Sequence, residues 1–566
     1  MEDFKKCTVY QIYPKSFYDS GQDGLGDLRG VTEKLDYIQA LGVDYVWLTP
    51  FFVSPQKDNG YDVEDYYAID PRYGTMEDFK QLVEEARRRG IGLMLDMVFN
   101  HTSSRHEWFL KALSGDETYK NYYIFKKGRG PGVPPTNWQS KFGGSAWEYV
   151  QEMDEYYLHL FDVSQPDLNW DNPQVRREMA AVVRFWMAQG VKGFRFDVVN
   201  LISKGEFKDD DAGDGRRFYT DGPNIHAYLK ELHENSFGQD ARIITVGEMS
   251  STSMESCYDY AGANSRELSM VFSFHHLKVD FAGNDKWVLV PFDFLKLKKI
   301  LFDWQVNMAE HDAWNALFWC NHDQPRVVSR FGDEGRYWKE SAKMLATVMH
   351  CLRGTPYIYQ GEELGMTNGD FEDLSQYRDV ESLNHFKLLC EKGLKKRYAF
   401  DILSVHSRDN SRTPVQWSDG LNGGFTLGHP WIGVNKNYVS INAARALADE
   451  DSIFHHYQKL VKLRKKYDVI ANGNVVPLAI SHPQILAYER HYKNEQLFVV
   501  NNFYARPADW DCGRSLSGFE VLLSNYPKPE RDGTVLHLRP YESIVYYKAT
   551  DASIWAKRLM SEAGKT

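Results

Sequence analysis

The sequence lacks the features that define three large classes of protein. Its net charge is −11, so it has no excess of basic residues to neutralise the phosphates of a nucleic acid. It contains no run of about 20 apolar residues, which a membrane-spanning helix needs. Its first residues, MEDFKKCTVY, contain no apolar core of a secretory signal. We therefore expect neither nucleic acid nor a membrane as a partner, and a cytoplasmic location.

Cysteine is scarce as well, and its spacing excludes two further classes. The six cysteines are widely separated and form no Cys-x-x-Cys pair: Cys7, Cys257, Cys320, Cys351, Cys390 and Cys512. Disulfide frameworks and structural zinc sites both need denser spacing, so we expect reduced thiols. No GxGxxG follows the first strand-like segment, which argues against an open dinucleotide-binding sheet.

The sequence does contain a long alternation of strand-like and helix-like segments. Apolar runs such as 43–50, 91–99 and 191–199 are typical of parallel strands buried on both faces. Between them, segments such as 28–42 and 75–90 carry apolar residues at helical spacing. About eight such units predict a (β/α)8 TIM barrel of the α/β class.

The alternation is interrupted by an insertion and followed by a different pattern. Residues 102–171 include GRGPGVPPTNWQSKFGGSAW, whose glycines and prolines indicate an irregular inserted α+β subdomain after the third strand. From 475 to 566, short strand-like segments follow one another closely and predict a C-terminal all-β sandwich. The barrel itself is expected to comprise 1–101 and 172–474.

Three acids follow apolar runs, at the strand ends where barrel enzymes carry their chemistry: Asp197, Glu248 and Asp323. Arg195 shares a strand face with Asp197, and its guanidinium would keep that carboxylate ionised. A partly desolvated Glu248 would have a raised pKa and hold a proton. An ionised nucleophile and a protonated acid are what retaining glycoside hydrolysis requires.

Each acid alone has a simpler explanation, as a helix cap or as the partner of an arginine. The three together, with His101 and His322 at further strand ends, favour a catalytic site. The aromatic content of 14% suits sugar binding, because an aromatic ring offers a flat apolar face to a pyranose. A large aromatic core explains the same composition equally well.

Several ordered motifs carry a resemblance that extends over nearly the whole chain. They are DMVFNH (96–101), GFRFDVVN (193–200), GEMS (247–250), NHDQPR (321–326), DNGYDVEDY (58–66), SRTPVQW (411–417) and, in the insertion, QPDLNW (165–170). Together they resemble the α-amylase superfamily, glycoside hydrolase family 13, in its oligo-1,6-glucosidase-like branch. The resemblance implies a retaining glycosidase that needs no cofactor for catalysis.

The resemblance also implies individual roles. Asp197 would be the nucleophile that forms a covalent β-glucosyl intermediate, Glu248 the acid and then the base, and Asp323 the stabiliser of the oxocarbenium-like sugar. Val198, directly after the nucleophile, is typical of members that cleave bonds other than α-1,4. The residues expected to hold the first glucose are Asp62, His101, Arg195, His322 and Arg412.

The loop DSGQDGLGDLRG suggests a structural metal. Asp19, Asp23 and Asp27 form an oxygen-rich, glycine-containing series that is typical of calcium loops, and magnesium is the alternative ion. Related enzymes bind calcium here, but this chain has Gly21 where they carry a side-chain ligand. A solvated turn before the first barrel helix is the competing interpretation.

A last set of residues points to a negatively charged substrate. The stretch FSFHHLKVD (272–280) looks like a strand interrupted by His275, His276 and Lys278, and GDGRRFYTDGP (213–223) adds Arg216 and Arg217. A phosphate needs cations or backbone donors, and on an extended strand His276 and Lys278 would share a face. Alternatively, the stem of Lys278 covers an apolar surface. Lys286 and Lys296 are weaker candidates.

Within the branch, these strings resemble the phospho-α-(1,1)-glucosidases. That resemblance implies hydrolysis of α,α-trehalose 6-phosphate to glucose and glucose 6-phosphate, by a protein we expect to be monomeric. An oligo-1,6-glucosidase or a sucrose isomerase, acting on a neutral disaccharide, is the nearest alternative. A transporter-associated relative would lack the acids and carry a membrane span, and a pure sugar-binding protein would have no use for all three acids.

Overall fold

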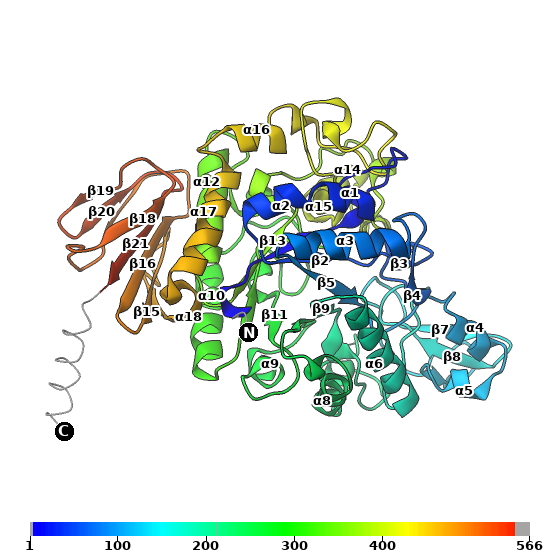
Figure 1. Ribbon diagram of the computed structural model, residues 1–566. Coiled ribbons are helices and arrows are strands. Elements are labelled where there is room, and N and C mark those ends of the chain that lie inside the picture. The colour runs from blue at the N-terminus through cyan, green and yellow to red at the C-terminus, as the bar shows by residue number, and fades with distance from the viewer. Residues whose placement is uncertain (1–3, 212, 550–566) are drawn as a thin grey trace, which may run out of the picture.

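A closed barrel of parallel strands forms the centre of the protein (Figure 1). The computed structural model describes residues 4–211 and 213–549. The barrel order is β1, β13, β12, β11, β10, β9, β5 and β2. These strands are β1 (Val9–Ile12), β2 (Tyr45–Leu48), β5 (Gly92–Met97), β9 (Gly193–Phe196), β10 (Ile244–Glu248), β11 (Met270–Phe272), β12 (Asn315–Leu317) and β13 (Thr355–Tyr359). The predicted TIM barrel is confirmed.

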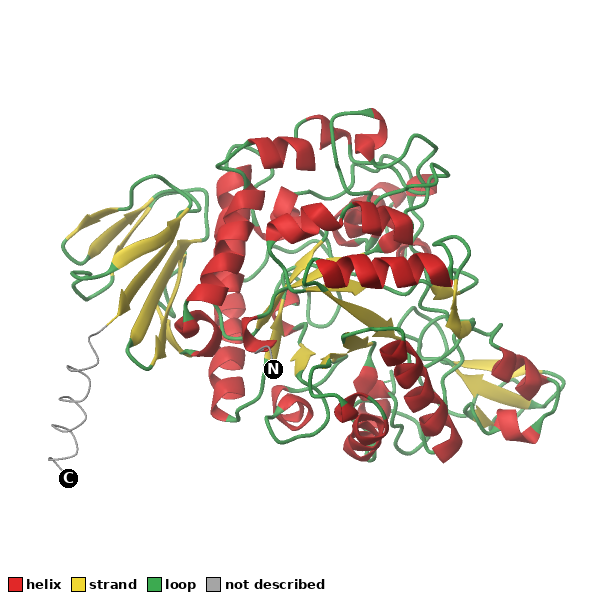
Figure 2. Ribbon diagram, in the orientation of Figure 1, coloured by secondary structure: helices red, strands yellow, loops and turns green. Residues whose placement is uncertain are grey.

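Helices surround the barrel strands, as Figure 2 shows in red around the central yellow arrows. Helix α3 (Met76–Arg88) illustrates why they form where they do. The Thr75 side chain accepts from the backbone N–H of Asp78, while the Asp78 carboxylate accepts from that of Thr75, which is a capping box. Its inner face is buried against the barrel through Phe79, Leu82 and Ala86.

The first predicted helix, 28–42, is divided in two. Helix α1 (Leu28–Glu33) ends at Lys34, and α2 (Leu35–Leu41) starts directly after it. Gly42 then closes α2 in the left-handed conformation, with φ of 92°.

The remaining helices cover the barrel or connect it to the other parts. Those along the barrel wall are α6 (Pro173–Ala188), α8 (Ile225–Asn235), α9 (Met254–Ala261), α10 (Phe294–Glu310) and α12 (Trp338–His350). Shorter or later ones are α7 (Arg216–Tyr219), α11 (Val327–Phe331), α13 (Val380–Glu391), α14 (Lys396–His406), α15 (Asp409–Arg412), α16 (Ala443–Ala448), α17 (Ile453–Lys466) and α18 (Asp468–Asn472). In the described part of the chain, no helix is both long and apolar enough to cross a membrane.

A small α+β unit follows the third barrel strand and lies at the opposite side of the barrel from the C-terminal sheets (Figure 1). Its sheet has the order β6 (Phe125–Lys126), β8 (Glu155–Leu158), β7 (Trp147–Val150), with α4 (Glu107–Leu113) and α5 (Glu117–Lys120) beside it. A two-stranded sheet, β3 (Phe52–Val53) and β4 (Asp65–Ile69), belongs to the second barrel loop. The buried Lys204 Nζ pairs with Asp167 at 2.8 Å and joins the insertion to the barrel.

The C-terminal part contains two antiparallel sheets. One has the order β14 (Asn474–Leu478), β15 (Ile485–Tyr492), β16 (Glu495–Asn502), β21 (Ser543–Ala549), β18 (Glu520–Ser524), and the other β17 (Ala508–Asp511), β20 (Val535–Leu538), β19 (Glu530–Asp532). Apolar residues from both sheets share a core, including Phe498, Ile544 and Leu536. The expected C-terminal all-β domain is confirmed, and residues 550–566 of its predicted range lie outside the described residues.

Candidate active site

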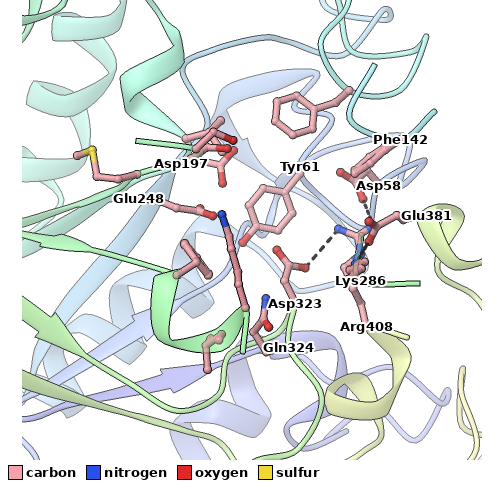
Figure 3. A pocket seen from close by; sticks show the side chains of 18 of the residues that line it. Asp58, Tyr61, Phe142, Asp197, Glu248, Lys286, Asp323, Gln324, Glu381 and Arg408 are labelled. Atoms are coloured by element: carbon pink, nitrogen blue, oxygen red, sulfur yellow. Dashed lines mark hydrogen bonds and ion pairs between the residues drawn. The ribbon is translucent and has the colours of Figure 1, made fainter. Parts of the chain in front are cut away.

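A cavity of about 290 Å³ opens where the barrel strands end, between the barrel loops and the insertion. Figure 3 shows Glu248 and Asp323 projecting into it, with Asp197 alongside. Its polar and charged lining is Asp58, His101, Asp197, Glu248, Ser250, Ser251, Lys278, Lys286, Asp323, Gln324, Glu381 and Arg408. The three acids predicted to be catalytic therefore share one cavity.

The register of the barrel explains how Asp197 and Glu248 meet. On β9, Phe196 lies opposite Gly247 of β10, so Asp197 and Glu248 leave adjacent strands at the same level. Arg195 Nη1 donates to Asp197 Oδ1 at 2.6 Å, and its Nη2 contacts Glu248. One guanidinium therefore contacts both carboxylates, and the separation of about 5–5.5 Å between them that a retaining mechanism needs stays a prediction.

Arg195 is more deeply embedded than the sequence suggested. It also donates to the buried Asp96 at 2.6 Å, and its side chain is 1% exposed. Burial raises the pKa of Asp96 to about 7, although Arg195 opposes that rise. Contacts with several acids thus fix the guanidinium in a single orientation.

The backbone beside Asp197 is strained. Val198 adopts a left-handed conformation, with φ of 34° and ψ of 40°, which a β-branched residue rarely does. Val198 lines the cavity, and such strain is typical of functional positions. The sharp turn starts directly after Asp197, as the strand ends.

Asp323 is held as an anion between two arginines. Its Oδ1 accepts from Arg412 Nη2 at 2.8 Å and from Arg408 Nη1 at 3.3 Å. Burial raises the pKa of Asp323, but the neighbouring His322, Arg408 and Arg412 outweigh burial and hold that pKa well below its ordinary value. His322 stacks on Tyr61, and burial lowers its pKa to about 3, so it is neutral.

Asp62 does not reach the cavity, which corrects the expectation that it holds the first glucose. Its carboxylate accepts from Ser54 Oγ at 3.0 Å and from the backbone N–H groups of Lys57 and Asp58 at 2.9 and 3.1 Å. It therefore organises the loop. Asp58, at the start of the same DNGYD motif, lines the cavity instead.

The predicted arginine is likewise replaced in the cavity by one four residues earlier in the sequence. Arg412 is buried behind Asp323, whereas Arg408, which the sequence reasoning missed, lines the cavity. Arg408 Nη2 lies 3.2 Å from Asp58 Oδ1 and thereby connects it with Asp323 (Figure 3). Burial raises the pKa of Asp58 to about 7, and Arg408 and Arg412 oppose that rise.

His101 lies in the cavity wall, where it was expected. Its Nε2 is 3.1 Å from the carbonyl oxygen of Tyr61 and 3.2 Å from Gln165 Nε2, which belongs to the QPDLNW motif. Burial lowers the pKa of His101, so its ring is neutral. A neutral imidazole in this position can exchange hydrogen bonds with sugar hydroxyls.

Aromatic side chains form the apolar walls, and the sequence could not identify which ones. Tyr61 contributes from the second barrel loop, Phe142 and Phe161 from the insertion, and Phe274 and Phe281 from the loop after β11. Flat apolar faces of this kind suit the faces of a pyranose ring.

The stretch 272–280 is not the extended strand that was expected. Strand β11 ends at Phe272, and His275–Leu277 form a 3-10 turn, η5. His276 is buried with its Nε2 2.8 Å from the carbonyl oxygen of Phe318, and His275 Nδ1 lies 2.9 Å from Ser273 Oγ. Burial lowers the pKa of both histidines to about 4, so neither supplies charge, and neither lines the cavity.

Of the three basic residues predicted in this stretch to bind the phosphate, Lys278 lies at the cavity. It lines the wall and, among the residues that the structure describes, no carboxylate pairs with it. Burial lowers its pKa, and Arg216 lowers it further.

The other predicted cations form ion pairs with acids or lie away from the cavity. Arg217 pairs with Asp210 at 2.8 Å and Arg216 with Asp214 at 3.1 Å, and neither lines the cavity. Lys286 lines it but pairs with Glu381 at 2.8 Å. Lys296 is exposed on α10.

The predicted metal loop does not assemble a ligand cluster. Asp19 accepts from the backbone N–H groups of Gln22 and Gly24 and from Thr426 Oγ1, at 2.6 to 2.8 Å. Asp27 caps α1, and Asp23 accepts from Leu25 N at 3.0 Å. Within 4–211 and 213–549, no three Asp, Glu, His or Cys side chains converge, so a structural calcium or magnesium ion at this loop stays a prediction.

Comparisons with known proteins agree with this geometry. The family model "Alpha amylase, catalytic domain" matches residues 11–473, and "Alpha-amylase SusG C-terminal domain" matches 485–545. The chain is 55% identical to trehalose-6-phosphate hydrolase of Bacillus subtilis (strain 168), over 96% of this chain and 98% of that one. It is 46% identical to oligo-1,6-glucosidase of Bacillus cereus, over 96% and 99%. A solved structure, Bacillus licheniformis trehalose-6-phosphate hydrolase (TreA), aligns with a TM-score of 0.93 at 54% identity, covering 97% of this chain and all of that one.

Proposed function

Because the chain belongs to the α-amylase family of glycoside hydrolases, we propose that it hydrolyses α,α-trehalose 6-phosphate to glucose and glucose 6-phosphate with retention of configuration. The unmodified glucose occupies the pocket around Asp197, and the phosphorylated glucose is the leaving group. Two of the barrel's acids and one water molecule carry the reaction.

In the first step, Asp197 attacks the anomeric carbon of the bound glucose. Glu248 gives its proton to the bridging oxygen, so glucose 6-phosphate leaves and a covalent glucosyl ester forms on Asp197. In the second step, Glu248 removes a proton from water, which attacks the same carbon and releases glucose and the Asp197 carboxylate. Both steps need only carboxylates and water, so catalysis requires no cofactor.

The other cavity residues stabilise the positive charge that develops on the sugar. Asp323 is a permanent anion between Arg408 and Arg412, and a preorganised charge of this kind stabilises the oxocarbenium-like state without rearrangement. Asp58 and His101 are the neighbouring groups for the hydroxyls of the first glucose.

The observation that carries the choice of a phosphorylated substrate is Lys278. It is an ammonium in the cavity wall with no carboxylate partner in the described part of the chain, and a dianionic phosphate supplies that partner. Higher identity to relatives named trehalose-6-phosphate hydrolase than to those named oligo-1,6-glucosidase supports the same choice.

The proposal includes the expected context of the enzyme. We propose that the barrel, 1–101 and 172–474, supplies the chemistry and that the insertion, 102–171, closes the leaving-group side. We propose that the enzyme is a monomer and acts in the cytoplasm on a charged sugar phosphate.

Product analysis tests the proposal. The purified enzyme is incubated with α,α-trehalose 6-phosphate, and its products are followed by proton NMR beside an incubation with isomaltose. We expect glucose that first appears as the α-anomer, together with one equivalent of glucose 6-phosphate. Faster turnover of isomaltose would instead support an oligo-1,6-glucosidase, and first-formed β-glucose would contradict retention.

A further inference from the structure

Lys278 is not the sole uncompensated cation beside the cavity. Lys141, in the inserted segment, extends toward the barrel, and its Nζ donates to Ser250 Oγ at 3.1 Å. Ser250 lines the cavity two residues after Glu248. Among described residues, no carboxylate lies within ion-pair distance of Lys141, whose Nζ is 5.4 Å from the centroid of the Tyr219 ring.

The loop that receives Lys141 is rigidly held. Asn200, three residues after Asp197, accepts from Ser250 N at 2.8 Å and donates to the Ser250 carbonyl oxygen at 2.9 Å. The ammonium of Lys141 is thereby positioned relative to both acids of the proposed mechanism. The hydroxyl of Ser250 is a neutral partner, so it satisfies a hydrogen bond and leaves the charge uncompensated.

Two other lysines near this site, Lys204 and Lys286, are paired with acids. Lys204 contacts Asp167 and Lys286 contacts Glu381, each at 2.8 Å. Lys141 is different: burial lowers its pKa to about 7, and repulsion from Arg216 and Lys278 contributes. Asp214, which pairs with Arg216, offsets part of this repulsion, and an anion placed between Lys141 and Lys278 would offset the rest.

We propose that Lys141 is a second ligand of the substrate phosphate and that, with Lys278, it encloses the 6-phosphate of the leaving glucose from the insertion side. This inference rests on the proposed function. The two ammoniums come from different parts of the fold, one from the insertion and one from the loop after β11, so a bound phosphate bridges them. A neutral leaving group leaves both charges uncompensated, which makes Lys141 a determinant of specificity.

A purely structural role for Lys141, tethering the insertion to Ser250, makes different predictions. Loss of a tether would disturb the pocket for every substrate and would reduce thermal stability. Loss of a phosphate ligand would affect phosphorylated ligands alone, because the first glucose pocket is built from other residues.

The test uses Lys141→Met, which keeps most of the apolar stem, and Lys141→Arg, which keeps the charge. Lys127→Met is the matched control, since Lys127 is exposed in the same insertion. For each, kcat/KM is measured with α,α-trehalose 6-phosphate and with 4-nitrophenyl α-glucoside, together with inhibition by glucose 6-phosphate and by glucose.

We expect Lys141→Met to lower kcat/KM for the phosphorylated substrate by about ten- to hundred-fold, the effect of losing a hydrogen bond between charged groups. Inhibition by glucose 6-phosphate should weaken in parallel. The aryl glucoside, inhibition by glucose and the control should change less than about three-fold, and Lys141→Arg should recover most of the loss.

Equal losses on both substrates, or no loss on either, would overturn the role of Lys141. If Lys278→Ala then remained selective for the phosphorylated substrate, the proposed function would stand without this inference. If the wild-type enzyme itself did not cleave α,α-trehalose 6-phosphate, the proposed function would fail and Lys141 would lose its ligand.

Discussion

The charged residues are arranged differently on the two sides of the cavity, the side of the first glucose and the side of the leaving group. Around the first glucose, acids contact arginines, so we call this side matched: Arg195 contacts Asp197 and Glu248, and Asp323 lies between Arg408 and Arg412. On the leaving-group side, Lys141 and Lys278 repel each other, and among the described residues no carboxylate forms an ion pair with either of them. The comparison indicates that the matched side performs the chemistry and that the unmatched side selects an anionic substrate.

This division predicts which substitutions affect all substrates and which affect one. Changes on the matched side should reduce hydrolysis of phosphorylated and neutral glucosides by similar factors. Changes on the unmatched side should separate the two. The predictions below run from the largest expected effect to the smallest.

Asp197→Asn should abolish turnover of both substrates, with a loss in kcat of about 10⁴-fold or more. The amide cannot form the glucosyl ester, while its shape keeps the hydrogen bond with Arg195. Steady-state kinetics with both substrates measures the effect, and a melting temperature near that of the wild type shows that the fold is intact. Substantial residual activity would disprove Asp197 as the nucleophile.

Asp58→Asn should lower kcat/KM by about hundred-fold for both substrates, because it removes a charged partner of the first glucose and of Arg408. The same kinetic assays test it. Since Asp58 touches neither lysine, a loss confined to the phosphorylated substrate would contradict the division of the cavity.

Lys278→Ala should lower kcat/KM for α,α-trehalose 6-phosphate by about ten- to hundred-fold and leave 4-nitrophenyl α-glucoside nearly unchanged. The ratio of the two values is the informative quantity, because it cancels any general effect on the acids. Lys296→Ala, on the exposed face of α10, is the control. A ratio equal to that of the wild type would argue that Lys278 merely covers an apolar surface.

A smaller effect is expected from pH. Burial, with repulsion from Arg216 and Lys278, lowers the pKa of Lys141 to about 7, while Asp214 acts in the opposite direction and Lys204 adds to the repulsion. Lys141 is therefore charged below about pH 7 and loses its charge above it, whereas a phosphate with a second pKa of about 6 is already dianionic there.

The ratio of kcat/KM for the phosphorylated over the neutral substrate should accordingly fall a few-fold as pH rises from about 6.5 to about 8.5. Parallel pH profiles of the two substrates measure that ratio. In Lys141→Arg the ratio should stay nearly constant, since arginine keeps its charge. If the ratio in the wild type rose with pH, the assignment of a positive charge to Lys141 below about pH 7 would be contradicted.

The sequence was sufficient to predict the barrel, because its apolar runs and helical periodicity repeat in a regular order. It also predicted that the three acids lie at the cavity, because each stands at or shortly after the end of an apolar run. The errors lie in loops. DNGYD contains two acids, and the fold turns Asp58 into the cavity and Asp62 into the loop; SRDNSRTP contains two arginines, and Arg408 rather than Arg412 lines it.

The residues predicted to bind the phosphate were the hardest to interpret from the sequence. His275 and His276 belong to a 3-10 turn in which His276 is buried, and a strand-like alternation does not predict such a turn. Arg216 and Arg217 have acidic neighbours close in sequence that pair with them. Lys141 gave no local signal, because its importance comes from a contact with Ser250 across more than a hundred residues.

The most direct test of the account compares α,α-trehalose 6-phosphate with α,α-trehalose, two substrates that share the scissile bond and differ only in the phosphate. Their kcat/KM values are measured with one enzyme preparation under one condition. The account predicts that the phosphorylated sugar is preferred by about hundred-fold or more, since two charged contacts depend on the phosphate. Equal values for the two sugars would contradict a phosphate-selecting side of the cavity.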